Sequence, residues 1–181
     1  MQSISFVTSN PSKTKQLSYH LNYPVNHISY DLPEIQSLDL NEIIVYKAKE
    51  AYKLSNTTVL VEDTSLQFLA LGKLPDPLIK WFLKELDNSG LCKLLNSYEN
   101  RNALAEAKYC LYDGSKIKVF GGSMNGEIAH FPRGENGFGW DSIFIPKGHT
   151  KTWGEMDDKE QRQTSMRRIA LQKLQQYLSE I

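Results

Sequence analysis

The chain has 181 residues, its 21 Lys and Arg residues balance its 21 Asp and Glu residues, and 40% of its residues are hydrophobic. A chain of this length buries roughly 70% of its unfolded surface, which is enough for one core without disulfides or a structural metal. This composition excludes a disordered, collagen-like or membrane-spanning chain, and zero net charge argues against a general nucleic-acid binder. We therefore expect a single soluble domain over residues 1–181 that binds neither nucleic acid nor membranes.

The cysteines and the first ten residues indicate the cellular compartment. Cys92 and Cys110 lack the CxxC spacing of a redox or zinc site, so we interpret them as reduced thiols. Residues 1–10 have neither the basic region nor the apolar run of a secretory leader. We expect a cytoplasmic protein.

The chain is predicted to open with a strand, a turn and a helix. Residues 4–8 are typical of a short buried strand, and Asn10 followed by Pro11 is typical of a helix start. Leu17 and Leu21, four residues apart, predict the inward face of that helix.

A second strand, a second helix and a third strand follow. Residues 25–30 predict a returning strand, and apolar spacing over residues 39–54 predicts a helix. Asp39 is placed as its N-cap, with Glu42 as the capping-box partner. The β-branched residues 57–61 predict a buried strand that ends at two acids.

The second half is predicted to add a hairpin, which makes the sheet mixed. We expect helices over 77–86 and 90–95, hairpin strands over 103–112 and 116–120, more strand over 124–131, a Gly-rich loop over 132–139, a short strand over 141–145, and a long helix from about residue 158.

Residues 8–13 are the first candidate for chemistry, and we call them the phosphate turn. Helix N–H groups, short polar side chains and the ammonium of Lys13 suit an anion at such a turn. Asn-Pro is also a plain capping pair, so both interpretations stay open.

Acidic residues form the second candidate. Two converging carboxylates suffice for Mg²⁺, which keeps several waters. Glu42 has a capping role, whereas Glu34, in a turn, has no structural explanation. Asp63 follows Glu62 at a predicted strand end, where α/β sheets commonly place ligands, and is the better general base.

Two further segments are candidates for chemistry, and the first of them suits a flat heterocycle. Residues 134–141 combine glycines with two aromatic side chains and a carboxylate, which suits stacking and hydrogen bonding; core packing of the aromatics is the alternative. Residues 165–168 carry two adjacent arginines, for which a solvated helix face is the alternative.

Taken in order, these segments resemble the inosine triphosphate pyrophosphatase family, enzymes that remove deaminated purine nucleoside triphosphates. The resemblance runs from residue 8 to about residue 174. The chain is most similar to the eukaryotic branch of the family in four segments: VLVEDT (59–64), IKWFL (79–83), FGWD (138–141) and EM (155–156).

The resemblance implies an α/β fold that is elongated and two-lobed, with a mixed, twisted central sheet and a substrate cleft between the lobes. It implies a homodimer that hydrolyses ITP, dITP and XTP to the monophosphate and pyrophosphate, cleansing the nucleotide pool. It also implies Mg²⁺ as the cofactor, with Mn²⁺ as a substitute.

Site roles follow from the same resemblance. The metal acids fall on Glu34 and Asp63, and the catalytic residues on Asp63 and Lys13. Substrate contacts fall on Thr8, Asn10, Lys13, Lys47, Thr64, Lys80, Phe138, Gly139, Trp140, Asp141, Ser165 and Arg167.

Three positions depart from the family pattern. Ser9 replaces a glycine of the phosphate turn, Gln161 a substrate-contacting lysine, and Met166 the histidine of a Ser-His-Arg signature. Because Met166 offers no equivalent hydrogen bond, one alternative is the same mechanism with shifted base specificity. The other is a nucleotide-binding module that has lost catalysis.

Overall fold

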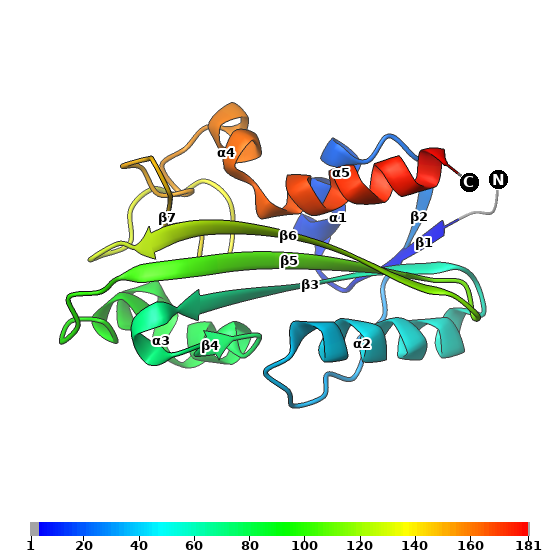
Figure 1. Cartoon of the computed structure of the whole chain (residues 1–181), viewed down its shortest axis with the longest axis horizontal. Coiled ribbons are helices and arrows are strands. Elements are labelled where there is room, and N and C mark those ends of the chain that lie inside the picture. The colour runs from blue at the N-terminus through cyan, green and yellow to red at the C-terminus, as the bar shows by residue number, and fades with distance from the viewer. Residues whose placement is uncertain (1–3, 181) are drawn as a thin grey trace. The chain divides into compact units, whose positions relative to one another are not determined.

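The computed structural model describes residues 4–180, which form an α/β fold (Figure 1). None of the helices within this range is long and apolar enough to cross a bilayer. In chain order the elements are β1 (Ile4–Val7), α1 (Pro11–His20), β2 (Val25–Ile28), α2 (Leu40–Ser55), β3 (Val59–Phe68), the 3-10 turn η1 (Leu69–Leu71), β4 (Pro75–Asp76), α3 (Ile79–Lys93), β5 (Asn102–Tyr112), β6 (Ile117–Ile128), β7 (Phe144–Pro146), α4 (Asp158–Thr164) and α5 (Met166–Ser179).

The strands form one open, twisted seven-stranded sheet in the order β2-β1-β3-β5-β6-β7, with β4 paired to β3. β1 pairs in parallel with β2 and β3, whereas β4 is antiparallel to β3 and β7 is antiparallel to β6. The predicted α/β class and mixed sheet are confirmed.

The chain divides into two compact units. Unit 1 takes the described residues up to Thr64, then Ala107–Gly122 and the residues from Arg167 onwards. Unit 2 takes Ser65–Glu106 and Ser123–Met166. The predicted elongated outline, the cleft between lobes and the single domain over 1–181 stay predictions.

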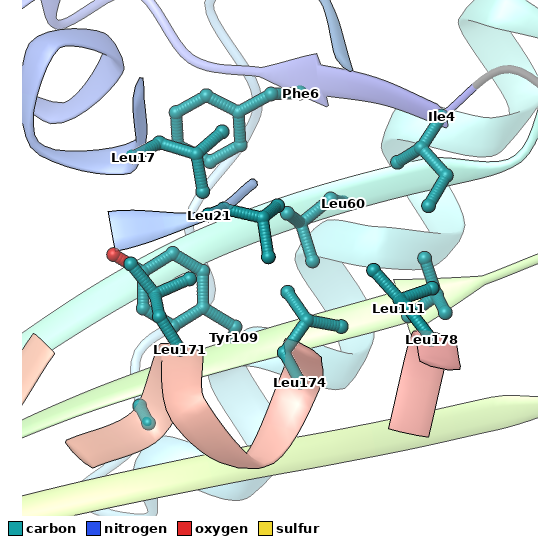
Figure 2. Packing of buried hydrophobic residues seen from close by; sticks show 11 residues of the cluster. Ile4, Phe6, Leu17, Leu21, Leu60, Tyr109, Leu111, Leu171, Leu174 and Leu178 are labelled. Carbon is teal, nitrogen blue, oxygen red and sulfur yellow. The ribbon is translucent and has the colours of Figure 1, made fainter. Parts of the chain in front are cut away.

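The sheet of unit 1 is buried on both faces because alternate side chains enter different clusters. One cluster joins β1, β3 and β5 to α1 and α5, and Figure 2 shows Phe6, Leu60 and Tyr109 among its members. On the other face Val59 and Val61 pack with residues of α2. Leu60 therefore points to one face of β3, and Val59 and Val61 point to the other.

Unit 2 contains a helix that bends where the sequence predicts two helices. Asp87 interrupts α3 with a φ of 53°, and its carboxylate accepts the N–H of Gly90 at 2.9 Å. The predicted break between residues 86 and 90 is therefore confirmed.

The prediction for the third strand is wrong at its C-terminal end. β3 continues to Phe68, and its C-terminal part pairs with the short β4, with Leu66 opposite Asp76. Glu62 and Asp63 thus lie within the strand. They still follow the part of β3 that pairs in parallel, since pairing with β1 ends at Leu60.

The long C-terminal helix is also predicted wrongly. Ser165 has an extended backbone, with ψ of 122°, and separates α4 from α5. Just before it, the buried hydroxyl of Thr164 accepts the indole N–H of Trp153 at 2.8 Å. The helix break at Ser165 therefore lies beside a hydrogen bond from Trp153, which is outside both helices.

Two smaller predictions also change. The predicted strand 141–145 is observed as β7, shifted toward the C-terminus. Asp39 caps α2 as expected, but Glu42 accepts the hydroxyl of Ser37, and Ser37 Oγ accepts the N–H of Asp39. A hydroxyl thus stands between the two members of the expected capping box.

Candidate functional site

The phosphate turn is closed by its own polar groups. Asn10 caps α1 by accepting the N–H of Ser12 at 3.0 Å, and its own N–H donates to Thr8 Oγ1 at 3.1 Å. Lys13 Nζ donates to the backbone carbonyl of Glu62 on β3 at 3.3 Å. The turn is therefore attached to the strand that carries the two acids.

Ser9 fits the phosphate turn without backbone strain. Within residues 4–180, the non-glycine residues with positive φ are Asn56, Asp76 and Asp87. A serine in place of glycine therefore leaves this turn in an ordinary conformation.

Lys47 brings two distant carboxylates together in unit 1. Its Nζ lies 3.3 Å from Glu34 Oε1 and 3.2 Å from Asp63 Oδ2. Glu34 comes from the loop after β2, Lys47 from α2 and Asp63 from β3. We call these three residues the acid–lysine cluster.

The pKa values of Asp63 and Lys47 are shifted so that both side chains stay charged at neutral pH. Burial alone would raise the pKa of Asp63, but the ammonium groups of Lys47 and Lys13 and the N–H of Thr64 lower it below its ordinary value. Burial would lower the pKa of Lys47, but Asp63 and Glu34 raise it. Asp63 is therefore a carboxylate and Lys47 an ammonium at neutral pH.

Lys13 has the opposite balance. Burial lowers its pKa, and the carboxylates of Glu62 and Asp63 offset this effect only in part. It loses its proton more readily than an ordinary lysine.

The donor set of the cluster fits a hard cation. Glu34 and Asp63 converge on one positive group, and carboxylate oxygens are the ligands that Mg²⁺ prefers. Among the described residues there is no group of three or more His, Cys, Asp or Glu side chains that could hold a metal. A cation here would take most of its ligands from water and substrate, as Mg²⁺ usually does.

Glu62 belongs to a different environment, which the sequence does not predict. Its Oε1 accepts Arg167 Nε at 2.9 Å, and its Oε2 accepts the Tyr109 hydroxyl at 3.1 Å. Burial, followed by the charge of Glu62, raises the pKa of Tyr109 well above 10.0. Arg167, proposed from the resemblance to contact the base, thus pairs with a buried carboxylate in the structure.

The predicted base-binding loop lies in unit 2, with its glycines in use. Asp141 Oδ2 accepts the N–H of Phe138 at 2.7 Å. Gly137 has a φ of 78°, and a side chain there would collide with Asp141. The carbonyl of Gly139 accepts Asn88 Nδ2 at 2.9 Å, which attaches the loop to α3.

The two aromatic residues of this loop differ in exposure. Trp140 is buried, and its ring centroid lies 5.6 Å from that of Trp153 and 5.9 Å from that of Phe144. Phe138 is half-buried. Core packing, the alternative interpretation of the loop, therefore describes Trp140.

The remaining candidates of unit 2 lie on α3, α4 and α5. Lys80 is exposed, with its Nζ 5.5 Å from the ring centroid of Trp81. Ser165 is half-buried at the break before α5, and Met166 is buried. Gln161 donates from Nε2 to the carbonyl of Trp153 at 2.6 Å, so this amide supports the fold.

The chain is similar to a known family over almost its whole length. The model of the Ham1 family matches residues 4–177. An inosine triphosphate pyrophosphatase of Schizosaccharomyces pombe is 38% identical over 98% of this chain and 96% of its own. Inosine triphosphate pyrophosphatase 2 of Trypanosoma cruzi is 42% identical over 93% of this chain and 88% of its own.

Solved structures agree with this result. A HAM1 protein from Coxiella burnetii superimposes with a TM-score of 0.87 at 26% identity, covering 100% of both chains. The Ham1 protein of Staphylococcus aureus superimposes with a TM-score of 0.82 at 25% identity, covering 99% of both chains.

Proposed function

Because the chain belongs to the Ham1 family, we propose that it hydrolyses ITP, dITP and XTP to the nucleoside monophosphate and pyrophosphate. The observation that carries this proposal is 38% and 42% identity, over nearly the full length, to proteins named inosine triphosphate pyrophosphatase. The reaction removes deaminated purine nucleotides from the nucleotide pool.

The acid–lysine cluster supports the chemistry of this reaction. A water oxygen bonds to the α-phosphorus, the bond from that phosphorus to the oxygen bridging to the β-phosphate breaks, and pyrophosphate leaves. Asp63 is ionised at neutral pH and accepts the proton of the water. Its direction is fixed because β3 is buried on both faces.

Positive side chains of unit 1 would bind the phosphates. A triphosphate carries about four negative charges, which Lys13 and Lys47 partly neutralise. Thr8 and Asn10 shape the phosphate turn, and Thr64 lies beside Asp63 on β3. Lys80 is proposed as a further substrate contact.

Glu34 and Asp63 would hold Mg²⁺, for which we expect Mn²⁺ to substitute. When bound, the cation would supply positive charge against the charge that develops as pyrophosphate leaves.

Recognition of the base is proposed for Phe138, Gly139, Trp140, Asp141, Ser165 and Arg167. Of the three departures from the family pattern, Gln161 and Met166 fall in the segments proposed to contact the substrate and its base. Gln161 Nε2 donates to the carbonyl of Trp153 and Met166 is buried, so neither offers the charge or the hydrogen bond of the residue that it replaces. We therefore expect their main effect on the choice between 6-oxo and 6-amino purines.

A panel of nucleoside triphosphates with Mg²⁺, scored for monophosphate and pyrophosphate, tests the proposal. We expect higher kcat/KM for ITP, dITP and XTP than for ATP and GTP. Release of single phosphates would contradict it. Tight ITP binding without turnover would favour the module that has lost catalysis, and a changed order of bases would favour shifted specificity.

We also propose that the protein acts in the cytoplasm as a homodimer. Light scattering coupled to size-exclusion chromatography measures the mass in solution, and a monomer mass would contradict the dimer.

A further inference from the structure

One polar side chain contacts the phosphate turn from the neighbouring strand β2. The Nε2 atom of His27 lies 2.9 Å from the backbone carbonyl oxygen of Thr8. A carbonyl oxygen only accepts hydrogen bonds, so Nε2 carries the proton and donates it. His27 is not among the site residues derived from the sequence.

The strand pattern alone does not explain a histidine at this position. Side chains alternate along β2, where Val25 packs on one core cluster and Ile28 on the other. His27 therefore lies on the side of Val25, yet it is exposed and lines an open cavity of about 210 Å³. Its contribution is the hydrogen bond to Thr8, not core packing.

This bond completes the attachment of Thr8 to β2. β1 ends at Val7, so the carbonyl of Thr8 lies beyond the regular ladder. The N–H of Thr8 donates to the carbonyl of Ile28 at 3.0 Å, and its carbonyl accepts from His27. Both backbone polar groups of Thr8 are thus held by β2.

The orientation of Thr8 also fixes the next peptide N–H. A trans peptide is planar, so the N–H of Ser9 points opposite to the carbonyl of Thr8. The N–H groups of Asn10, Ser12 and Lys13 are bonded inside the turn. No residue in the range 4–180 accepts the N–H of Ser9.

We infer that His27 is a positioning residue for phosphate binding: by holding the carbonyl of Thr8 against β2, it presents the N–H of Ser9 to a phosphate group of the substrate. The inference rests on the proposed function, because it names how the same site binds its triphosphate. Losing one oriented donor corresponds to about a tenfold weaker phosphate contact.

Two substitutions of His27 distinguish the contribution of its N–H donor from that of its ring. His27→Phe keeps a ring and removes the donor, whereas His27→Gln removes the ring and keeps an N–H donor at a similar reach. His130→Ala, an exposed histidine of unit 2, is the matched control. Thermal unfolding checks that each variant folds, and His27→Ala is the second donor-free variant if His27→Phe does not.

The readouts are binding of inorganic tripolyphosphate by calorimetry, the amide NMR signal of Ser9 during that titration, and kcat and KM for ITP. For His27→Phe we expect about tenfold weaker tripolyphosphate binding and about tenfold higher KM, with kcat within about twofold. The Ser9 amide should move downfield on binding in the wild type and much less in this variant. His27→Gln and His130→Ala should stay within about threefold of the wild type.

Equal binding by His27→Phe and the wild type would overturn the inference. Equal losses in the Phe and Gln variants would also overturn it, because they would indicate a packing role. If the wild type does not hydrolyse ITP, the proposed function fails, and the tripolyphosphate titration still decides the role of His27.

Discussion

Neighbouring carboxylates on β3 have opposite environments because side chains alternate along a strand. The Glu62 side chain is 0% exposed and pairs with Arg167, while that of Asp63 is 17% exposed and pairs with Lys47. A buried charge held by a charged partner and a hydroxyl serves the fold. Asp63 is the carboxylate that remains accessible for chemistry.

Replacing Asp63 with Asn should remove turnover and keep the fold. The amide has the same shape but accepts no proton and binds cations weakly, so we expect kcat for ITP to fall by at least about a hundredfold. Lys47 keeps its contact with Glu34. Pyrophosphate release measures the loss, and circular dichroism checks the fold.

Asp158→Asn is the matched control, because Asp158 is exposed in the first turn of α4. It should retain wild-type activity. Substantial turnover in Asp63→Asn would remove Asp63 as base and metal ligand.

Lys13 should set the alkaline limit of substrate capture. Its pKa is lowered by burial, so the ammonium is lost as pH rises through a value below the ordinary 10.5. The value of kcat/KM for ITP reports the free enzyme. We expect it to decrease as pH rises, with the midpoint of the decrease at a pH lower than 10.5. Lys13→Arg should move this limb to higher pH, because a guanidinium keeps its charge. An unchanged limb in Lys13→Arg would assign it to another group.

The stability of the folded chain should depend on pH through Asp63. Its pKa is lowered in the folded chain, so its pairing stabilises the fold above the ordinary value of 3.8. That contribution is lost as pH falls through the lower folded value. Neutral and mildly acidic buffers should therefore preserve the cluster.

Among the elements, α2 is the one that local signals describe best. Its N-cap at Asp39 and its apolar spacing predict residues 39–54, and the structure has Leu40–Ser55. These signals are local: a cap lies next to its helix, and a core-facing stripe repeats with the helix period. The start of α1 at Asn10 and Pro11 was predictable for the same reason.

Elements that depend on distant contacts escape such reasoning. The C-terminal part of β3, which runs to Phe68, pairs with β4, and α4 ends beside a hydrogen bond from Trp153. The alternation of β3 could have separated Glu62 from Asp63. It could not have identified Arg167, which lies 105 residues further along the chain.

The hydrogen bond beside the break between α4 and α5 can be tested through Thr164. Thr164→Val keeps the shape but leaves the buried indole N–H of Trp153 without its acceptor. We expect the free energy of unfolding to fall by about 1–3 kcal/mol, measured by urea denaturation. Thr164→Ser, which keeps the hydroxyl, should recover most of the loss.

Thr150→Val provides the control, because Thr150 is exposed and Arg133 contacts only its backbone carbonyl. Its stability should stay within about 0.5 kcal/mol of the wild type. Equal effects at the two threonines would contradict a special role for Thr164.

For the whole molecule, metal removal should affect activity far more than folding. Chelation by EDTA should abolish ITP hydrolysis, and added Mg²⁺ or Mn²⁺ should restore it. Without the cation, the two carboxylates lack the positive charge that would offset the charge developing on pyrophosphate. The midpoint of thermal unfolding should change little. Full activity in EDTA would exclude the proposed cofactor.

Lys47 also bears on whether the chain needs a cation in order to fold. Its ammonium supplies countercharge from within the chain, so Glu34 and Asp63 are not left to repel each other while the chain folds. A zinc finger, by contrast, needs its metal before it can fold. We therefore expect the chain to fold without a bound cation, so that folding and loading of the proposed Mg²⁺ are separate events.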